Sequence, residues 1–177
     1  MRNRIAALLA LALLPACGGG GNVVAPPPVT TPPTPAASIS ATGNGALVLH
    51  PSSDTRFGVA METPIRVIES GGGSADWNFA RLGIFLRGAE IERVEVSATT
   101  INAAGFGRIN ANSNQAVRLI YRFNSSDFDR LDLTLGFTDR RDSRVFTTLV
   151  PFQTFSDVNV SLTPLSTGEP IISFVRD

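Results

Sequence analysis

The chain has 177 residues, about the length of one domain, and its 15 positive and 15 negative side chains balance to a formal net charge of zero. All the positive charges are arginines, because the sequence contains no lysine, and this excludes every chemistry that needs a lysine, including a phosphate-binding P-loop and a Schiff base. The sequence has no clustered basic face, so we expect no nucleic-acid partner.

The first sixteen residues have the organisation of a secretory signal peptide. A short basic stretch with Arg2 and Arg4 precedes ten apolar residues, Ile5 to Leu14. Ten residues are too few to cross a hydrocarbon core of roughly 30 Å as a helix, which takes about 20. They suit the apolar region of a signal peptide. The next residues, Leu14-Pro15-Ala16-Cys17, place a small residue directly before the only cysteine of the chain.

This order of residues resembles the lipobox of bacterial lipoproteins. The resemblance implies that signal peptidase II recognises Leu14 and Ala16 and cleaves before Cys17, whose sulfur carries diacylglycerol. Two or three acyl chains give stable membrane attachment, whereas one chain is marginal. Gly18 occupies the position at which enterobacterial lipoproteins of the inner membrane have aspartate. Glycine at this position implies attachment to the outer membrane, on either its periplasmic or its surface side. A plain secretory signal followed by a chance cysteine is the alternative.

Residues 17–37 are expected to form a disordered tether between the lipid and the rest of the chain. Gly18 to Gly21 is a run of four glycines, and residues 22–37 contain six prolines. This composition cannot bury a core, and its proline-rich part favours an extended chain of about 3.1 Å per residue. A tether of this length would reach roughly 60 Å. A proline-rich ligand for a partner domain is the alternative interpretation.

Residues 38–177 are predicted to form one all-β domain, because short apolar stretches alternate there with turn residues. Alternation with a period of two predicts half-buried strands. Four sets of residues are expected to face inward: Ala80, Leu82, Ile84 and Leu86; Val117, Leu119, Tyr121 and Phe123; Leu131, Leu133, Leu135 and Phe137; Val158, Val160 and Leu162. Further strands are expected at residues 46–50, 56–61, 64–68, 91–98, 145–152 and 171–175.

About nine or ten short strands predict an antiparallel β-sandwich, immunoglobulin-like or fibronectin-like in general shape, with a small barrel as the alternative. The strongest predicted hairpin joins residues 131–137 to residues 145–152. Trp77 resembles the core tryptophan of immunoglobulin domains, without their flanking cysteines, and we expect it in the core. Arg118 and Arg122 are expected to pair with Asp132 if their strands are neighbours.

Few residues offer catalytic or metal-binding chemistry. His50 is the only histidine, no second histidine or free cysteine stands at ligand spacing from it, and we expect no cofactor. Asp127, Asp129 and Asp132 supply oxygen ligands of the kind that Ca²⁺ takes, but they lack the order of an EF-hand loop. They are a weak metal candidate, and an ordinary solvated turn is favoured. The run Gly71–Gly73 has no following lysine and is expected to be a flexible loop.

These features favour a non-catalytic envelope lipoprotein that binds or scaffolds another envelope protein. Its expected partners are the membrane, through the lipid on Cys17, and an envelope protein. A carbohydrate-binding or small-ligand-binding module is the first alternative. A hydrolase is the second, and it requires a cleft around His50 with a carboxylate and a hydroxyl within reach.

Overall fold

The computed structural model describes residues 31–43, 47–124, 127–153, 158–160 and 170–176. All the elements described below belong to one compact unit, Pro33–Asp177. The predicted signal peptide, the predicted lipobox and the expected tether as far as residue 30 lie outside the described residues.

The first sheet has six strands: β1 (Ile39–Gly43), β2 (Leu47–Pro51), β3 (Val59–Glu69), β7 (Asn114–Phe123), β10 (Val158–Val160) and β11 (Ile171–Val175). Its order is β10-β2-β3-β7-β11, and β1 pairs with the second half of β3, beyond the part of β3 that pairs with β2. The edge strands β10 and β11 run parallel to β2 and β7, whereas the other pairings are antiparallel.

The second sheet has five strands: β4 (Ala75–Leu86), β5 (Ala89–Ser97), β6 (Arg108–Ile109), β8 (Arg130–Asp139) and β9 (Val145–Gln153). Its order is β5-β4-β8-β9, all antiparallel, and the two residues of β6 pair with the start of β4. A short helix, α1 (Ala98–Ala103), follows β5.

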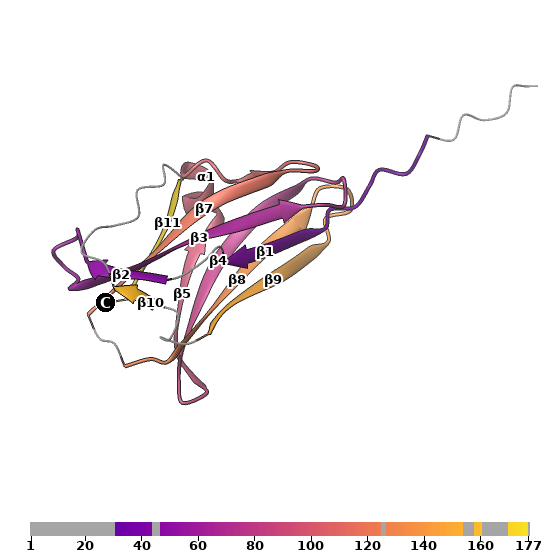
Figure 1. Cartoon of the computed structure of the whole chain (residues 1–177). Coiled ribbons are helices and arrows are strands. Elements are labelled where there is room, and N and C mark those ends of the chain that lie inside the picture. Colours follow the sequence, from indigo (N-terminus) through magenta and orange to yellow (C-terminus); the bar gives the residue numbers. More distant parts are fainter. Residues whose placement is uncertain (1–30, 44–46, 125–126, 154–157, 161–169, 177) are drawn as a thin grey trace, which may run out of the picture. The chain divides into compact units, whose positions relative to one another are not determined.

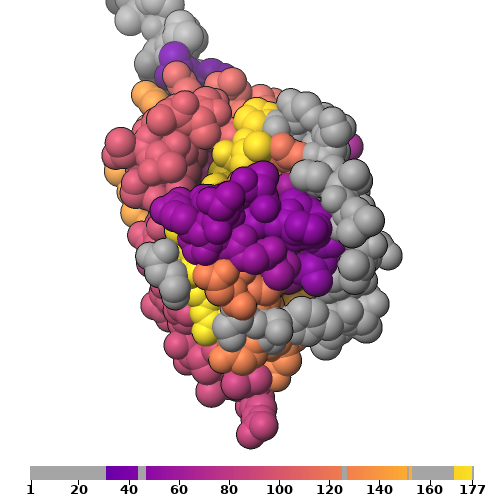
Figure 2. Space-filling model, turned by 90° about the vertical axis from the view of Figure 1, so that its left-hand side faces the viewer, coloured from indigo at the N-terminus to yellow at the C-terminus, as the bar shows by residue number. Residues whose placement is uncertain are grey.

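The two sheets pack face to face and share one apolar core, so the domain is an all-β sandwich, as predicted (Figure 1). In the described residues no strand of one sheet pairs with a strand of the other, which distinguishes the fold from the barrel alternative. In the side view of Figure 2, the segment that includes β2 (purple) occupies the middle of the visible face, and β11 (yellow) is seen above it and at its lower left.

The inward faces predicted from the alternation are confirmed on three strands, because side chains of alternate residues point to opposite faces of a sheet. Less than 6% of each of these eleven side chains is exposed: Ala80, Leu82, Ile84, Val117, Leu119, Tyr121, Phe123, Leu131, Leu133, Leu135 and Phe137. Leu86, at the end of its strand, is half-buried. Val158 and Val160 lie in β10, and neither their side chains nor Leu162 is among the described parts of the chain.

Trp77 is confirmed as a core residue, with 1% of its surface exposed. Its ring centroid lies 6.0 Å from that of Phe106 and 5.6 Å from that of Phe137. The indole Nε1–H donates to the backbone oxygen of Phe79 at 2.9 Å, so the polar atom of this buried ring is satisfied. Phe106 reaches the core from the chain between α1 and β6.

The predicted hairpin between residues 131–137 and 145–152 is confirmed as β8 and β9, with Leu131 opposite Phe152 and Thr138 opposite Val145. The turn between β4 and β5 consists of Arg87 and Gly88, both at positive φ (52° and 81°). A two-residue turn with positive φ at both positions matches the right-handed twist of the two strands.

The two strands predicted at residues 56–61 and 64–68 are a single strand, β3, which continues through Pro64. On one side of β3 the pairing with β2 ends at Glu62, and the pairing with β1 begins at Ile65. Pro64 therefore lies where that edge has no partner, a position that tolerates a residue without a backbone N–H. The alternation did not predict β1, β6 or the six-residue helix α1, which are all short.

The expected pairing of Arg118 and Arg122 with Asp132 is wrong, because β7 and β8 belong to different sheets. Arg118 lies 3.5 Å from Glu62, and Arg122 donates to the Ser173 hydroxyl at 2.5 Å. Asp132 pairs with Arg130 on its own strand, at 3.2 Å. Two strands that follow each other along the chain here cross from one sheet to the other.

Candidate functional site

The last residues of the expected tether are bound to both sheets. The Ala37 N–H donates to the Asp139 carboxylate at the end of β8, at 2.9 Å. The next N–H, of Ser38, donates to the Glu69 carboxylate at the end of β3, at 3.0 Å. The Ser38 carbonyl accepts from the N–H of Ser70 at 3.0 Å. We call Ala37, Ser38, Glu69, Asp139 and the Gly71–Gly73 loop the tether junction.

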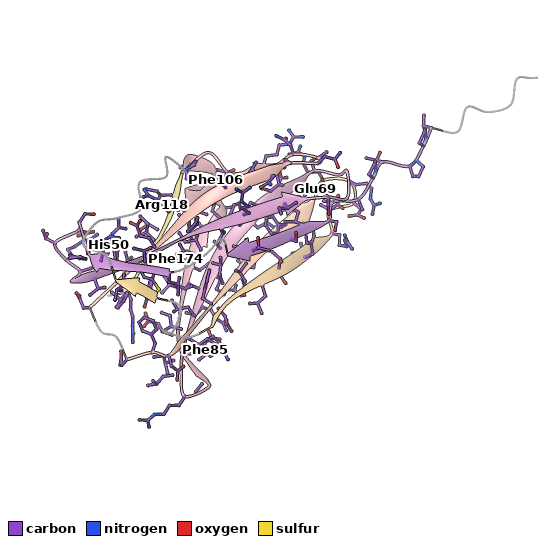
Figure 3. The ribbon with its side chains drawn as sticks, in the orientation of Figure 1. His50, Glu69, Phe85, Phe106, Arg118 and Phe174 are labelled. Atoms are coloured by element: carbon purple, nitrogen blue, oxygen red, sulfur yellow. The ribbon has the colours of Figure 1, made fainter. Side chains whose placement is uncertain are left out.

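Glu69 is the centre of this junction and lies at the opposite end of β3 from His50 (Figure 3). Its buried carboxylate accepts four backbone N–H groups, from Ser38 (3.0 Å), Gly71 (2.7 Å), Gly72 (3.2 Å) and Asn112 (2.7 Å). Burial alone raises the pKa of Glu69, but the four N–H groups outweigh it, and the net pKa lies below its ordinary value. Glu69 therefore remains an anion that joins three separate segments of backbone.

Asp139 has the same role on the second sheet. It has no exposed surface, and its two oxygens accept the N–H of Ala37 (2.9 Å) and of Arg141 (2.8 Å). Its backbone closes the β8–β9 turn, because its N–H donates to Arg144 and its carbonyl accepts from Ser143. The two buried carboxylates thus attach consecutive residues of the entering chain to different sheets.

The run Gly71–Gly73 is packed against the entering chain and is not the loosely held loop that the sequence suggested. A Cβ atom on Gly73 would lie 2.6 Å from the carbonyl carbon of Ala36, and one on Gly71 would lie 2.8 Å from the nitrogen of Ser38. Real Cβ atoms do not approach backbone this closely, so these positions require glycine for steric reasons. The glycines leave room for residues 35–38.

Replacing Gly73 by alanine is expected to lower the free energy of unfolding by about 2 kcal/mol, because neither backbone segment can move without breaking the junction. Urea unfolding followed by tryptophan fluorescence measures the loss. Gly58→Ala is the matched control, since its Cβ would meet only the Asn124 side-chain oxygen at 3.8 Å. That variant should stay within about 0.5 kcal/mol of the parent. Equal losses in the two variants would contradict the packing role of Gly73.

His50 belongs to a buried charged group on the outer face of the first sheet. Its Nε2 lies 3.1 Å from the Glu62 carboxylate, at ion-pair distance but outside hydrogen-bond alignment. Arg118 lies 3.5 Å from the other Glu62 oxygen. His50 and Glu62 are 4% and 2% exposed. Figure 3 shows His50 and Arg118 in the same part of the first sheet.

Both ring nitrogens of His50 are directed at protein groups. Nδ1 lies 2.7 Å from the Pro51 carbonyl oxygen, which can only accept, so Nδ1 carries the hydrogen. Nε2 faces Glu62. A histidine that activates a hydroxyl nucleophile needs one nitrogen on its carboxylate and the other on the hydroxyl. Here the second position is taken by a backbone carbonyl, and this arrangement suits a structural role for His50.

Asp127, Asp129 and Asp132 are not brought together. Asp127 lies 3.3 Å from Arg176, Asp129 accepts the N–H of Arg87 at 2.7 Å, and Asp132 pairs with Arg130. Across the described ranges, no three histidine, cysteine, aspartate or glutamate side chains are grouped so that they could hold a metal ion.

The outer face of the second sheet carries a hollow of about 130 Å³ beside Gly83 on β4. Phe85, Thr134 and Leu149 line it, together with two arginines and two carboxylates, Arg81, Arg93, Glu90 and Asp132. We call this the Gly83 hollow. Gly83 stands at an outward position between Arg81 and Phe85. The sequence therefore shows that a side chain is missing there, but only the structure shows the hollow above this position.

Comparison with known protein families and with characterised proteins finds no match to this chain. In the described residues no helix has the length and apolar composition needed to cross a membrane.

Proposed function

We propose that the chain is the precursor of a bacterial envelope lipoprotein, anchored by lipid on Cys17, whose sandwich domain binds or scaffolds another envelope component without catalysis. One observation carries the proposal: the basic residues, the ten apolar residues and Leu14-Pro15-Ala16-Cys17 stand in the order of a lipoprotein signal. The implied location is the outer membrane.

The tether junction supports this proposal. A domain held by lipid at its N-terminal end experiences any pull on the tether at the first folded residues. Here those residues are Ala37 and Ser38, and each is bound to a buried carboxylate on a different sheet. A pull at this point is shared between β3 and β8, which are central strands of the two sheets.

Replacing Cys17 by serine is expected to abolish incorporation of labelled palmitate and to release the protein from the membrane fraction, because the serine hydroxyl is not the acceptor of the lipid. Fractionated cells grown with labelled palmitate provide the measurement. Ala16→Gly, which keeps a small residue before the cleavage site, is the matched control and should retain label and membrane association. A Cys17→Ser protein that still sediments with label would refute the lipid anchor.

The non-catalytic role is supported by the surroundings of His50, whose ring nitrogens both face protein groups. An immunoglobulin-like arrangement is supported by the pairing of β3 with β7 and of β4 with β8, which corresponds to the central strand pairs of the two immunoglobulin sheets. Trp77 lies on β4, which corresponds in this pairing to the strand that carries the core tryptophan of immunoglobulin domains. Such sandwiches commonly present binding surfaces and not catalytic clefts.

A protein partner is the first candidate for what the domain binds. Its test is recovery of a reproducible partner with the exported chain from detergent-solubilised envelopes, compared with the Cys17→Ser protein. A carbohydrate is the second candidate, and the Gly83 hollow is the specific observation that favours it.

A further inference from the structure

The Gly83 hollow exists because one position of a well-filled sheet face lacks a side chain. Gly83 lies opposite Arg93 on β5 and Asp132 on β8, so it is flanked on both sides by long or polar side chains. Glycine within a strand weakens it and often marks a place where another molecule approaches the backbone. Part of the space is taken by Phe85, whose Cε2 lies 3.0 Å from where a Gly83 Cβ would stand. About 130 Å³ remains open beside it.

The polar groups around the hollow are joined in ion pairs. The Arg93 guanidinium donates to both oxygens of Glu90, at 2.6 and 3.0 Å, and this pairing lowers the pKa of Glu90. Arg81 donates through two nitrogens to one oxygen of Glu95, at 2.8 and 2.7 Å. A guanidinium has five N–H groups, so each arginine keeps donors that its ion pair does not use. A carboxylate oxygen has two lone pairs, so each carboxylate keeps acceptors that its ion pair does not use.

The charge of the lining is balanced. Two arginines, Arg81 and Arg93, stand against two carboxylates, Glu90 and Asp132. A binding site for an anion or a cation needs an excess of the opposite charge, and this site has none. Donors beside acceptors instead suit hydroxyl groups, because each hydroxyl can donate and accept.

The hollow also has an apolar side. Leu149 is 55% exposed and lines it from β9. Phe85 contributes ring carbons, because its Cε2 and Cζ lie 3.0 and 3.6 Å from where a Gly83 Cβ would stand, and the Arg130 guanidinium lies 4.0 Å from its ring centroid. A ligand with hydroxyls around its rim and C–H groups on its face would contact both kinds of surface.

We propose that the Gly83 hollow binds one ring of a neutral polysaccharide. The volume of about 130 Å³ is below the 300–1,000 Å³ of usual small-molecule pockets, which favours a single sugar ring over a larger compact ligand. A site of this size binds its sugar with a Kd on the order of millimolar. Such weak binding becomes useful when many copies on one membrane contact one polymer. The inference deepens the carbohydrate candidate of the proposed function, on which it rests, and it does not depend on the lipid anchor.

The test is a titration of the exported chain, purified in detergent, followed through its backbone amide resonances. The probes are cellohexaose, maltohexaose and the N-acetylglucosamine hexamer as neutral sugars. The glucosamine hexamer and hexagalacturonate are the cationic and anionic counterparts, and an uncharged hexapeptide represents a protein ligand. At least one neutral sugar is expected to shift the amides of Gly83, Thr134 and Leu149 saturably, and more strongly than either charged sugar.

Leu149→Ala is expected to weaken that binding about fivefold, because it removes apolar contact area from the site. Val145→Ala is the matched control, since Val145 is 65% exposed on the same strand but does not line the hollow. Its affinity should equal that of the parent. The amide spectra themselves report whether each variant is folded.

Three results would overturn the proposal: no shift with any neutral sugar, tighter binding of a charged sugar or the peptide at these amides, or equal loss of affinity in the two variants. Palmitate labelling is unaffected by all three, so failure of the sugar site is distinguishable from failure of the anchor.

Discussion

Replacing Glu62 by leucine is expected to lower the free energy of unfolding by about 3–5 kcal/mol, because the change removes the buried carboxylate that lies beside the Arg118 guanidinium and the His50 ring. Glu62 is 2% exposed and lies between His50, at 3.1 Å, and Arg118, at 3.5 Å. The loss arises from the partners that remain and not from the apolar leucine, which suits a buried site. Urea unfolding monitored by circular dichroism measures it.

The double variant His50→Leu/Glu62→Leu separates the cost of the polar partners that remain from the cost of the leucine itself, because it removes the imidazole together with the carboxylate. It should recover part of the loss, since replacing both members of a buried pair is often close to neutral. Glu95→Leu is the exposed control: Glu95 pairs with Arg81, its side chain is 43% exposed, and its loss should stay below about 1 kcal/mol. If Glu62→Leu costs no more than Glu95→Leu, the buried charged group is not what stabilises this face.

Replacing Glu69 by glutamine is expected to lower the free energy of unfolding by about 3 kcal/mol at neutral pH. The reason is that the NH₂ group of the amide, a donor, would face backbone N–H groups, which are also donors. The carboxylate accepts four backbone N–H groups, and one amide oxygen cannot accept them all. Hydrogen exchange should report where the loss occurs, with faster exchange in β1, which follows Ser38 directly. Glu95→Gln is the control and should change neither measurement appreciably.

The pH dependence of the Glu69 variant has a definite sign. The pKa of Glu69 in the folded chain lies below its ordinary value of 4.5. A carboxyl whose pKa is lowered on folding contributes stability above its unfolded pKa and loses it as the pH falls through the folded pKa. The difference between parent and Glu69→Gln should therefore be full at pH 7, begin to shrink below about pH 4.5 and disappear in stronger acid. A difference that stays constant down to strongly acidic pH would show that the charge of Glu69 is not involved.

Both carboxylates of the tether junction could have been noticed in the sequence. Glu69 follows Ile65 and Val67 at the same spacing of two, and both of these are fully buried. Asp139 likewise continues the inward series that ends with Phe137. An acidic residue at the last inward position of an apolar strand is a signal for a buried carboxylate with backbone donors. Which donors it meets is decided by segments far away in the chain.

Glu62 carries no comparable signal. Its neighbours on the outward side of β3 are Ala60 and Pro64, so the alternation places it on the solvent face. The structure buries it almost completely on that outer face, next to His50 from β2 and Arg118 from β7. No pattern in the sequence places these three residues together, because their contact depends on the order of strands within one sheet.

The sequence alone determined the local properties of this protein: the lipoprotein-like N-terminal order around Cys17, the strand character of the domain, and the residues that face the core. These follow from neighbouring residues, since the period of two is a property of the pleated strand itself. Only the tertiary structure decided that β7 and β8 lie in different sheets, that Pro64 sits within a continuous strand, and that Gly83 opens a hollow. Those outcomes depend on strand partners that are distant in the chain. The alternation cannot reveal them, because its period of two is the same whichever strand lies alongside.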